Sequence, residues 1–250
     1  MKYILICLSF LIAGCSTGIP EHHRVVLNNL NQPKAYNQIN QYNQLILQKA
    51  DIVSAITFNF RGRALSALGI TELDSENNSF SVAALSPMGM TLFKLKREKG
   101  ELVSRYIMPQ FGPKEMDKTA EMNKMPDMIN NDIALIYFNR NLNLPESVSV
   151  PENFFDMDKY GVTIHTQANN QAGNKNYQYI FSGNPLKLIK KSMLENKTKI
   201  WSVDYYDYKN VGSKEIPYKI FFKNYTYGYT IDIQTIDIQT NHTQNGEIKK

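Results

Sequence analysis

Hydrophobic and polar residues follow four different patterns along the 250-residue chain. Residues 3–12 form an almost unbroken apolar run, and residues 16–38 are polar with no sustained apolar period. From about Leu45 apolar residues recur at every second position, except over residues 114–139, where they recur at helical spacing. Because period two indicates strands and period 3.6 indicates helices, we expect a leader, a tether and one β-rich domain with a helical insertion.

The first apolar run has the features of an export signal. Lys2 supplies a positive charge, the run is too short to span the ~30 Å apolar core of a bilayer, and Ile-Ala-Gly-Cys occupies positions 12–15. This pattern resembles bacterial lipoprotein precursors, which implies a signal peptide over residues 1–14 and a diacylated Cys15 as the first mature residue. Ser16 then favours the outer membrane. An ordinary signal peptide with a chance cysteine is the alternative.

The composition of the mature chain restricts its chemistry. Cys15 is the only cysteine left after the signal, so neither an intrachain disulfide nor a cysteine-based metal site is expected. Residues 15–38 are interpreted as a lipidated, flexible tether that precedes a domain over residues 39–250. His22 and His23 fall in this tether, where solvated side chains are favoured over a metal site. The formal charge of +5 is dispersed and gives no nucleic-acid signature.

The domain reads as an antiparallel meander, because short apolar-alternating segments are separated by short turns. The expected strands are residues 52–60, 64–73, 79–85, 91–96, 102–108, 177–181, 200–208, 218–223 and 229–240. Residues 114–139 are expected to form two short helices, since Pro126 interrupts their apolar period. Residues 141–175 are weakly patterned and include a loop at 169–174.

No motif for catalysis, cofactor or metal is present in the sequence. Phosphate-binding loops, dinucleotide fingerprints, nucleophile elbows and zinc-protease motifs are absent. We therefore expect no enzymatic activity, no cofactor and no metal. The alternative is an enzyme in which His165 joins Ser and Asp residues from other parts of the chain in a catalytic triad. Seven of the ten methionines lie in residues 88–128, where they either line an adaptable apolar surface or fill the core.

A local stretch resembles a known superfamily. Residues 79–95 read as a strand, a loop with Pro87, Met88 and Gly89, and a second strand. This is similar to the LolA/LolB superfamily of lipoprotein carriers, and most similar to its DUF3261 lipoproteins. The resemblance implies a mainly β (α+β) fold, in which a curved, incompletely closed antiparallel sheet wraps around a helical plug or lid and holds an acyl-chain cavity. It also implies that Met88 contacts membrane or a partner, as the apolar loop residue of LolB does.

The alternation and the resemblance together give a functional hypothesis. The chain is expected to be anchored by Cys15 to membrane lipid at the periplasmic face of the outer membrane, to bind an acyl-type hydrophobic ligand, and to help deliver lipid or lipoprotein, with a link to aryl-polyene lipid export. The competing hypothesis is an envelope scaffold with a packed core and a protein partner. The candidate ligand-binding residues are Ile56, Phe58, Phe60, Leu85, Leu92, Phe93, Met116, Met125, Met128 and Ile129.

Overall fold

The computed structural model describes residues 26–27, 30–60, 62–108, 120–138, 155–167 and 175–240. The expected signal peptide, Cys15, the histidine pair, Met116 and the loop at 169–174 lie outside these residues. Within them, no helix combines the length and the apolar character needed to cross a bilayer.

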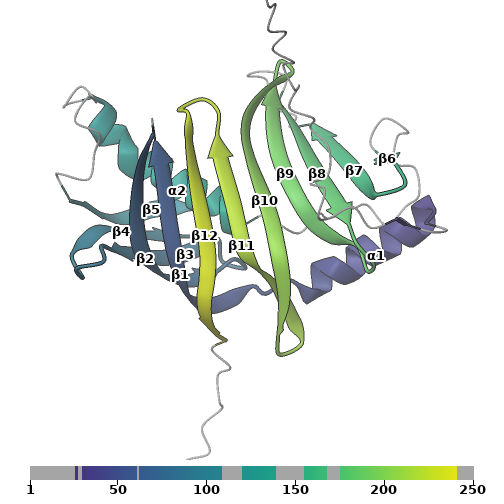
Figure 1. Ribbon diagram of the computed structural model, residues 1–250, viewed down its shortest axis with the longest axis horizontal. Helices are drawn as coiled ribbons and strands as arrows, with labels where there is room; N and C mark the ends of the chain where they lie inside the picture. The colour runs from purple at the N-terminus through teal and green to yellow at the C-terminus, as the bar shows by residue number, and fades with distance from the viewer. Residues whose placement is uncertain are drawn as a thin grey trace, which may run out of the picture.

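The described strands form one antiparallel sheet of 12 strands in the order β5-β4-β3-β2-β1-β12-β11-β10-β9-β8-β7-β6 (Figure 1). Their bounds are β1 Lys49–Phe60, β2 Arg63–Asp74, β3 Ser79–Leu85, β4 Thr91–Glu98, β5 Glu101–Ile107, β6 Phe155–Met157, β7 Gly161–Gln167, β8 Lys175–Ser182, β9 Lys187–Glu195, β10 Thr198–Val211, β11 Lys214–Asn224 and β12 Tyr229–Gln239. The first and last long strands, β1 and β12, pair along their length and join two meanders. Because β5 and β6 end the order, the sheet is open, which confirms the expected fold class.

The alternation of apolar residues explains which face of each strand is buried. In β3, for example, Phe80, Val82 and Ala84 are buried while the residues between them are half-exposed. All nine expected strands are present. Three others, β6, β7 and β9, were not predicted; in β9 a buried Lys191 stands where a simple alternation requires an apolar residue.

Helix α1 spans Gln32–Leu45 and corrects the predicted boundary of the tether. Its first turn is capped because the Asn31 side chain accepts a hydrogen bond from the Lys34 amide at 3.1 Å. Ala35, Ile39 and Tyr42 form its buried face, and the Tyr42 ring lies 5.8 Å from that of Phe181 in β8. Residues 32–38 are therefore part of the folded domain, held by packing of a narrow apolar stripe.

Helix α2 spans Ala120–Tyr137 without a break, so the prediction of two short helices is wrong. Pro126 lies inside this helix and is buried. A proline removes one backbone donor, and the burial of Met125, Ile133 and Ile136 against the sheet offsets that loss. In Figure 1 the helix lies behind β1 and β12.

Two side chains from the C-terminal meander hold the end of α2. The Tyr205 hydroxyl donates to the Ile136 carbonyl at 2.8 Å, and the Lys191 ammonium donates to the Phe138 carbonyl at 2.8 Å. Carbonyls in the last turn of a helix lack partners within it, and a cation is favourable there. These contacts fix the C-terminal end of α2 to β9 and β10 of the C-terminal meander.

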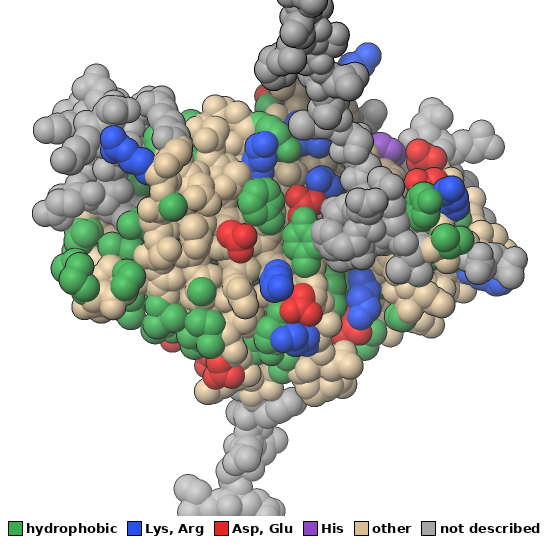
Figure 2. All heavy atoms as spheres, in the orientation of Figure 1, with side chains coloured by type: hydrophobic (Ala, Val, Ile, Leu, Met, Phe, Trp, Pro, Cys, Tyr) green, Lys and Arg blue, Asp and Glu red, His purple; other side chains and the backbone are tan. Residues whose placement is uncertain are grey.

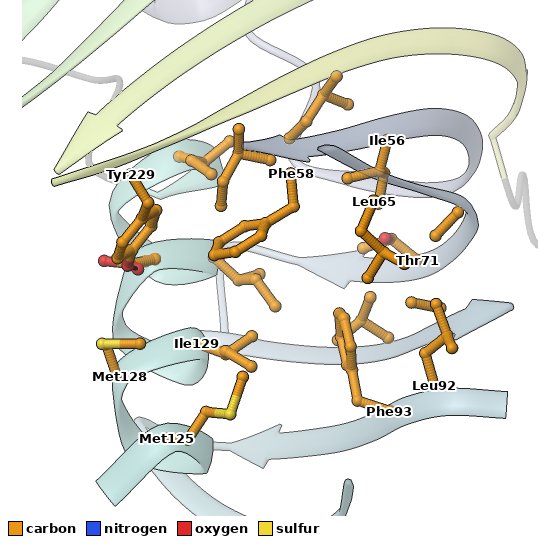
Figure 3. Close-up of a pocket in the computed structure, with 18 of the residues that line it drawn as sticks. Ile56, Phe58, Leu65, Thr71, Leu92, Phe93, Met125, Met128, Ile129 and Tyr229 are labelled. Carbon is orange, nitrogen blue, oxygen red and sulfur yellow. Dashed lines mark hydrogen bonds between the residues drawn. The ribbon is translucent and has the colours of Figure 1, made fainter. Parts of the chain in front are cut away.

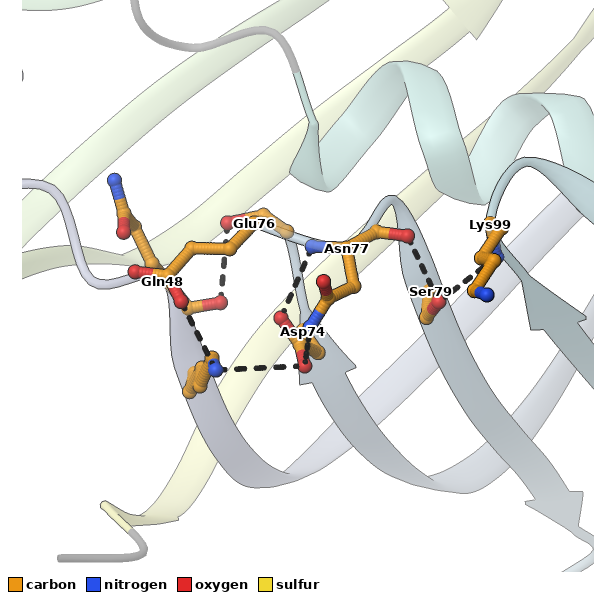
Figure 4. A network of polar contacts seen from close by, with 8 residues as sticks. Gln48, Asp74, Glu76, Asn77, Ser79 and Lys99 are labelled. Carbon is orange, nitrogen blue, oxygen red and sulfur yellow. Dashed lines mark hydrogen bonds and ion pairs between the residues drawn. The ribbon is translucent and has the colours of Figure 1, made fainter.

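A polar network fixes the turn between β2 and β3 (Figure 4). The Lys49 ammonium lies 2.9 Å from the Glu76 carboxylate and 3.6 Å from that of Asp74. Asp74 also accepts hydrogen bonds from the backbone and side-chain amides of Asn77 at 3.2 and 2.7 Å. This turn is at the opposite end of β2 and β3 from the loop that contains Met88. The network therefore holds β1, β2 and the turn to β3 together at the end of the sheet that lies away from that loop.

The face of the sheet seen in Figure 2 has two regions. Acidic and basic side chains are mixed over the central strands, and hydrophobic side chains gather toward the left of the view, over the N-terminal meander. The mixture of both signs agrees with the dispersed charge of the sequence.

Candidate functional site

An apolar pocket lies between α2 and the strands β1–β4 and β12, with a cavity volume of about 80 Å³. In Figure 3 the side chains of Phe58, Ile129 and Phe93 point into the same space from a strand above, the helix and a strand below. The residues that line it are Ile56, Phe58, Leu65, Ala67, Thr71, Val82, Ala84, Leu92, Phe93, Met125, Met128, Ile129, Asp132, Ile133, Ile136, Tyr137, Tyr229, Ile231 and Ile233.

A β-bulge explains why two consecutive residues of β4 face the pocket. Ala84 is opposite Phe93, whereas Leu85 is opposite Thr91, so Leu92 is the extra residue on β4. Consecutive residues of a regular strand point to opposite faces, but a bulge changes the direction of a side chain locally. Leu92 and Phe93 therefore both line the wall (Figure 3).

A glycine makes room for one side chain of the pocket wall. Gly69 in β2 pairs with Ser54 in β1, and a Cβ placed on Gly69 would lie only 2.4 Å from the Ile56 Cδ1 atom. The Ile56 side chain thus lies over the glycine, where any larger residue would displace it. The shape of this part of the wall depends on the absence of a side chain at position 69.

A buried acid stands in the wall that α2 contributes. The Asp132 side chain is 4% exposed, and it accepts a hydrogen bond from the Tyr229 hydroxyl at the start of β12. Burial raises the pKa of the Asp132 carboxyl to about 8, and a hydrogen bond from the Asn224 side chain partly opposes that shift. The carboxyl is therefore mainly protonated at neutral pH.

Seven of the ten predicted ligand-binding residues line this pocket, namely Ile56, Phe58, Leu92, Phe93, Met125, Met128 and Ile129. Phe60 packs against the core as a half-buried side chain but does not line the pocket, because it lies at the very end of β1. Leu85 is not a lining residue either; it follows Ala84, which faces the pocket, and so points to the other side of β3. Met116 lies outside the described residues.

The loop between β3 and β4 lies at the end of the sheet where the pocket reaches the surface. Leu65 in β2 lines the pocket and is 37% exposed, so the pocket reaches the surface at this residue. The loop begins after Leu85, which pairs with Leu68 in β2, so the loop lies beside the end of β2 that contains Leu65. Met88 at the tip is 83% exposed. The Gly89 amide donates to the Ser86 carbonyl at 2.8 Å, and Gly89 adopts a positive φ of 78° that closes this turn. Met88 is thereby held in solvent.

Several lining residues were not predicted from the sequence. The most informative is Asp132, whose spacing from Met125, Ile129 and Ile136 places it on the apolar face of α2. A carboxylate at a helical position of an otherwise apolar stripe is the signal that identifies it. Tyr229 gives no comparable signal, because it is one of ten tyrosines over residues 160–229.

The described residues do not meet the requirements of a metal site. No group of three or more His, Cys, Asp and Glu side chains there could hold a metal ion. His165 lies in β7 and is not among the lining residues of the pocket. The arrangement offers an apolar surface with one protonated acid, which is suited to binding.

A family model described as "Protein of unknown function (DUF3261)" matches residues 52–237, which include both the pocket strands and α2. The chain belongs to the DUF3261 family. This confirms the resemblance seen in residues 79–95. No curated protein matches the sequence.

Solved structures resemble this DUF3261 protein in fold. A LolA superfamily protein, NE2245 from Nitrosomonas europaea, matches with a TM-score of 0.52 and 10% identity, over 82% of this chain and 93% of its own. A DUF1329 family protein from Desulfovibrio piger matches with a TM-score of 0.50 and 9% identity, over 84% of this chain and 93% of its own. At these identities the likeness establishes the fold. The DUF3261 chain thus has a LolA-like open sheet.

Proposed function

We propose that this protein is a lipoprotein of the bacterial envelope that binds an acyl chain in the pocket between α2 and the sheet. The observation that carries this proposal is the apolar wall formed by Phe58, Leu92, Phe93, Met125 and Ile129, which reaches the surface beside an exposed methionine loop. Burial of each CH₂ group contributes about 0.8 kcal/mol. Each additional CH₂ group that enters the pocket should therefore tighten binding about fourfold.

The size of the cavity sets a condition on this binding. A volume of about 80 Å³ is smaller than the roughly 150 Å³ of an apolar cavity that holds benzene. An acyl chain therefore enters only if side chains on α2 change rotamer or the helix shifts outward. Met125 and Met128 are the residues best able to do this, because methionine is unbranched and adapts its shape.

The position of the protein in the cell is part of the proposal. The sequence supports an anchor at Cys15 in the periplasmic face of the outer membrane, and the fold is shared with a LolA superfamily protein. The exposed Met88 would then contact lipid or a protein partner while the pocket receives or releases an acyl chain. The role is binding and delivery without catalysis, which agrees with a lining that contains no His, Cys or Ser among the described residues.

Native mass spectrometry of the purified protein, with lipid extraction of the same sample, tests the pocket. We expect a discrete additional mass of lipid size, and we expect Phe93→Glu to lose it while the fold is retained, because a charge in the apolar wall opposes an acyl chain. Val103→Glu, at a site on β5 that is 52% exposed, is the matched control and should keep the ligand.

The small cavity favours one alternative, an envelope scaffold whose core is packed. A scaffold would show the mass of the protein alone and would take up no added fatty acid or phospholipid. That result, in a sample with a native fold, would overturn the proposal of an acyl-binding protein.

A further inference from the structure

The pocket contains one carboxyl group in a wall that is otherwise built from aliphatic, aromatic and methionine side chains, apart from Thr71 and the two tyrosine hydroxyls. Asp132 lies on the same face of α2 as Met125 and Ile129, so its side chain belongs to the wall of the cavity. Burying a polar group is costly unless it is hydrogen-bonded. The position of this acid therefore requires partners, and the structure provides them.

A chain of hydrogen bonds leads from an exposed turn to this acid. The Tyr227 amide donates to the Asn224 Oδ1 atom at 3.1 Å, and the Asn224 Nδ2 atom lies 3.3 Å from the Tyr229 hydroxyl, to which it donates. Tyr229 in turn donates its hydroxyl proton to the Asp132 carboxyl. The Tyr229 ring is also held between Phe58 and Phe222, at 5.1 and 6.2 Å. The pair is thus fixed in position before any ligand arrives.

We propose that Asp132 and Tyr229 form a polar anchor that binds the oxygen-bearing end of an acyl-type ligand, such as a carboxyl, ester or hydroxyl group. This inference rests on the proposed function, because it needs an acyl chain in the pocket. The anchor would fix the orientation of the ligand. The polar end of the ligand lies between α2 and β12, and its acyl chain lies against Ile129, Leu92 and Phe93. The anchor would also favour oxygen-bearing ligands over plain hydrocarbons, because a hydrocarbon offers no hydrogen-bond partner to Asp132 and Tyr229.

The chemistry of the pair agrees with a neutral oxygen as the group that is bound. Burial holds the pKa of Asp132 at about 8, so at neutral pH the acid carries a proton that it can donate. A carboxylic acid kept neutral in an apolar site is an effective hydrogen-bond donor. The Tyr229 hydroxyl can exchange its bond to Asp132 for a bond to the ligand, which keeps both groups satisfied.

The test compares probes of equal chain length in the full protein and its variants. Binding of octane and 1-octanol is measured at pH 6 by displacement of a neutral fluorescent naphthylamine. The quantity of interest is the ratio of the 1-octanol affinity to the octane affinity, because a change in packing affects both probes and cancels. For Asp132→Leu and for Tyr229→Phe we expect this ratio to fall about tenfold, as for the loss of one buried hydrogen bond.

Thr71→Val is the matched control, since it removes another hydroxyl from the same pocket and should leave the ratio unchanged. Tyr229→Phe keeps the ring contacts with Phe58 and Phe222, so it tests the anchor even if Asp132→Leu does not fold. Unchanged ratios in variants that still bind octane would overturn the anchor and leave the acyl pocket standing. Failure of the wild-type protein to bind any of the probes would overturn the proposed function and the anchor with it.

Discussion

The hydroxyl of Tyr229, the first residue of β12, donates a hydrogen bond to Asp132 in the middle of α2. This bond joins the helix to the central strands of the sheet on the side of the pocket. Because both residues are at least 96% buried, neither can exchange its partner for water while the helix stays in place.

The buried acid makes the stability of the protein dependent on pH. The folded pKa of Asp132 is raised from 3.8 to about 8, so the folded state holds a proton that the unfolded state releases between these values. The contribution of Asp132 to the free energy of unfolding should therefore decrease as the pH rises from its unfolded pKa of 3.8 to about 8, and it should level off above that pH. We expect Asp132→Asn to lose less stability than the wild type between pH 6 and pH 9, by about 1 kcal/mol or more, or roughly 2–4 °C in Tm.

Urea denaturation at several pH values measures this difference directly. The replacement keeps the size of the side chain and an oxygen that accepts from Tyr229, so the hydrogen bond itself is retained. If the two proteins lose stability in parallel over the same pH range, Asp132 is not the group that titrates.

The close approach of Gly69 and Ile56 predicts a coupled pair of substitutions. Gly69→Ala should destabilise the fold by about 1–3 kcal/mol, because the new methyl group forces the Ile56 side chain out of its rotamer. Ile56→Val removes the Cδ1 atom that lies 2.4 Å from the new methyl group. In that background Gly69→Ala should cost clearly less.

A double-mutant cycle of unfolding free energies measures the coupling. Strict additivity of the two substitutions would show that the contact does not control the site. The same variants should differ in probe binding, since Ile56 lines the pocket.

The strands of the domain could be predicted from the sequence because their faces alternate, as in Phe80, Val82 and Ala84. Among the predicted residues that line the pocket, Ile56 and Phe58 follow from this alternation in β1, and Met125, Met128 and Ile129 follow from the helical spacing of α2. Leu85 does not line the pocket because it comes one position after Ala84 and so points to the opposite side of β3. The position of α2 decides which part of the buried face lines the pocket.

The elements that could not be predicted depend on tertiary contacts. Helix α1 is rich in Asn and Gln, and it is held to the domain by a buried stripe at Ala35, Ile39 and Tyr42 and by a hydrogen bond from the Leu186 amide to Gln38. Helix α2 continues through Pro126 because its apolar face is buried. Lys191 in β9 occupies a buried position where alternation requires an apolar residue, because its ammonium group donates to the Phe138 carbonyl at the end of α2. In each case packing outweighs local preference.

The exposed Met88 predicts a loss of lipid interaction without a loss of stability. A side chain that is 83% exposed contributes little to the core, so Met88→Glu should change the unfolding free energy by less than about 0.5 kcal/mol. If the loop contacts a membrane, the added charge should strongly reduce co-sedimentation with phospholipid vesicles.

Ile236→Glu is the matched control, because Ile236 is 57% exposed on the outward face of β12, away from the loop. Vesicle binding that is equally reduced by both substitutions would reflect net charge. Binding that is unaffected by Met88→Glu would remove the loop from the proposed delivery step.

The contact between Tyr205 and the Ile136 carbonyl predicts how firmly α2 is held. Tyr205→Phe removes a buried hydroxyl that donates at 2.8 Å to the last turn of the helix. The carbonyl is left without this partner in a buried site, so the free energy of unfolding should fall by about 1–3 kcal/mol. Tyr227→Phe, on a side chain that is 55% exposed, should have no measurable effect.

Hydrogen exchange of the Tyr205→Phe variant shows which element loses stability. The amides of α2 should become less protected than those of β10, because the end of the helix is released while the hydrogen bonds of the sheet remain. Equal loss of protection in both elements would mean that α2 unfolds only with the whole domain, and that it cannot open alone to admit a ligand.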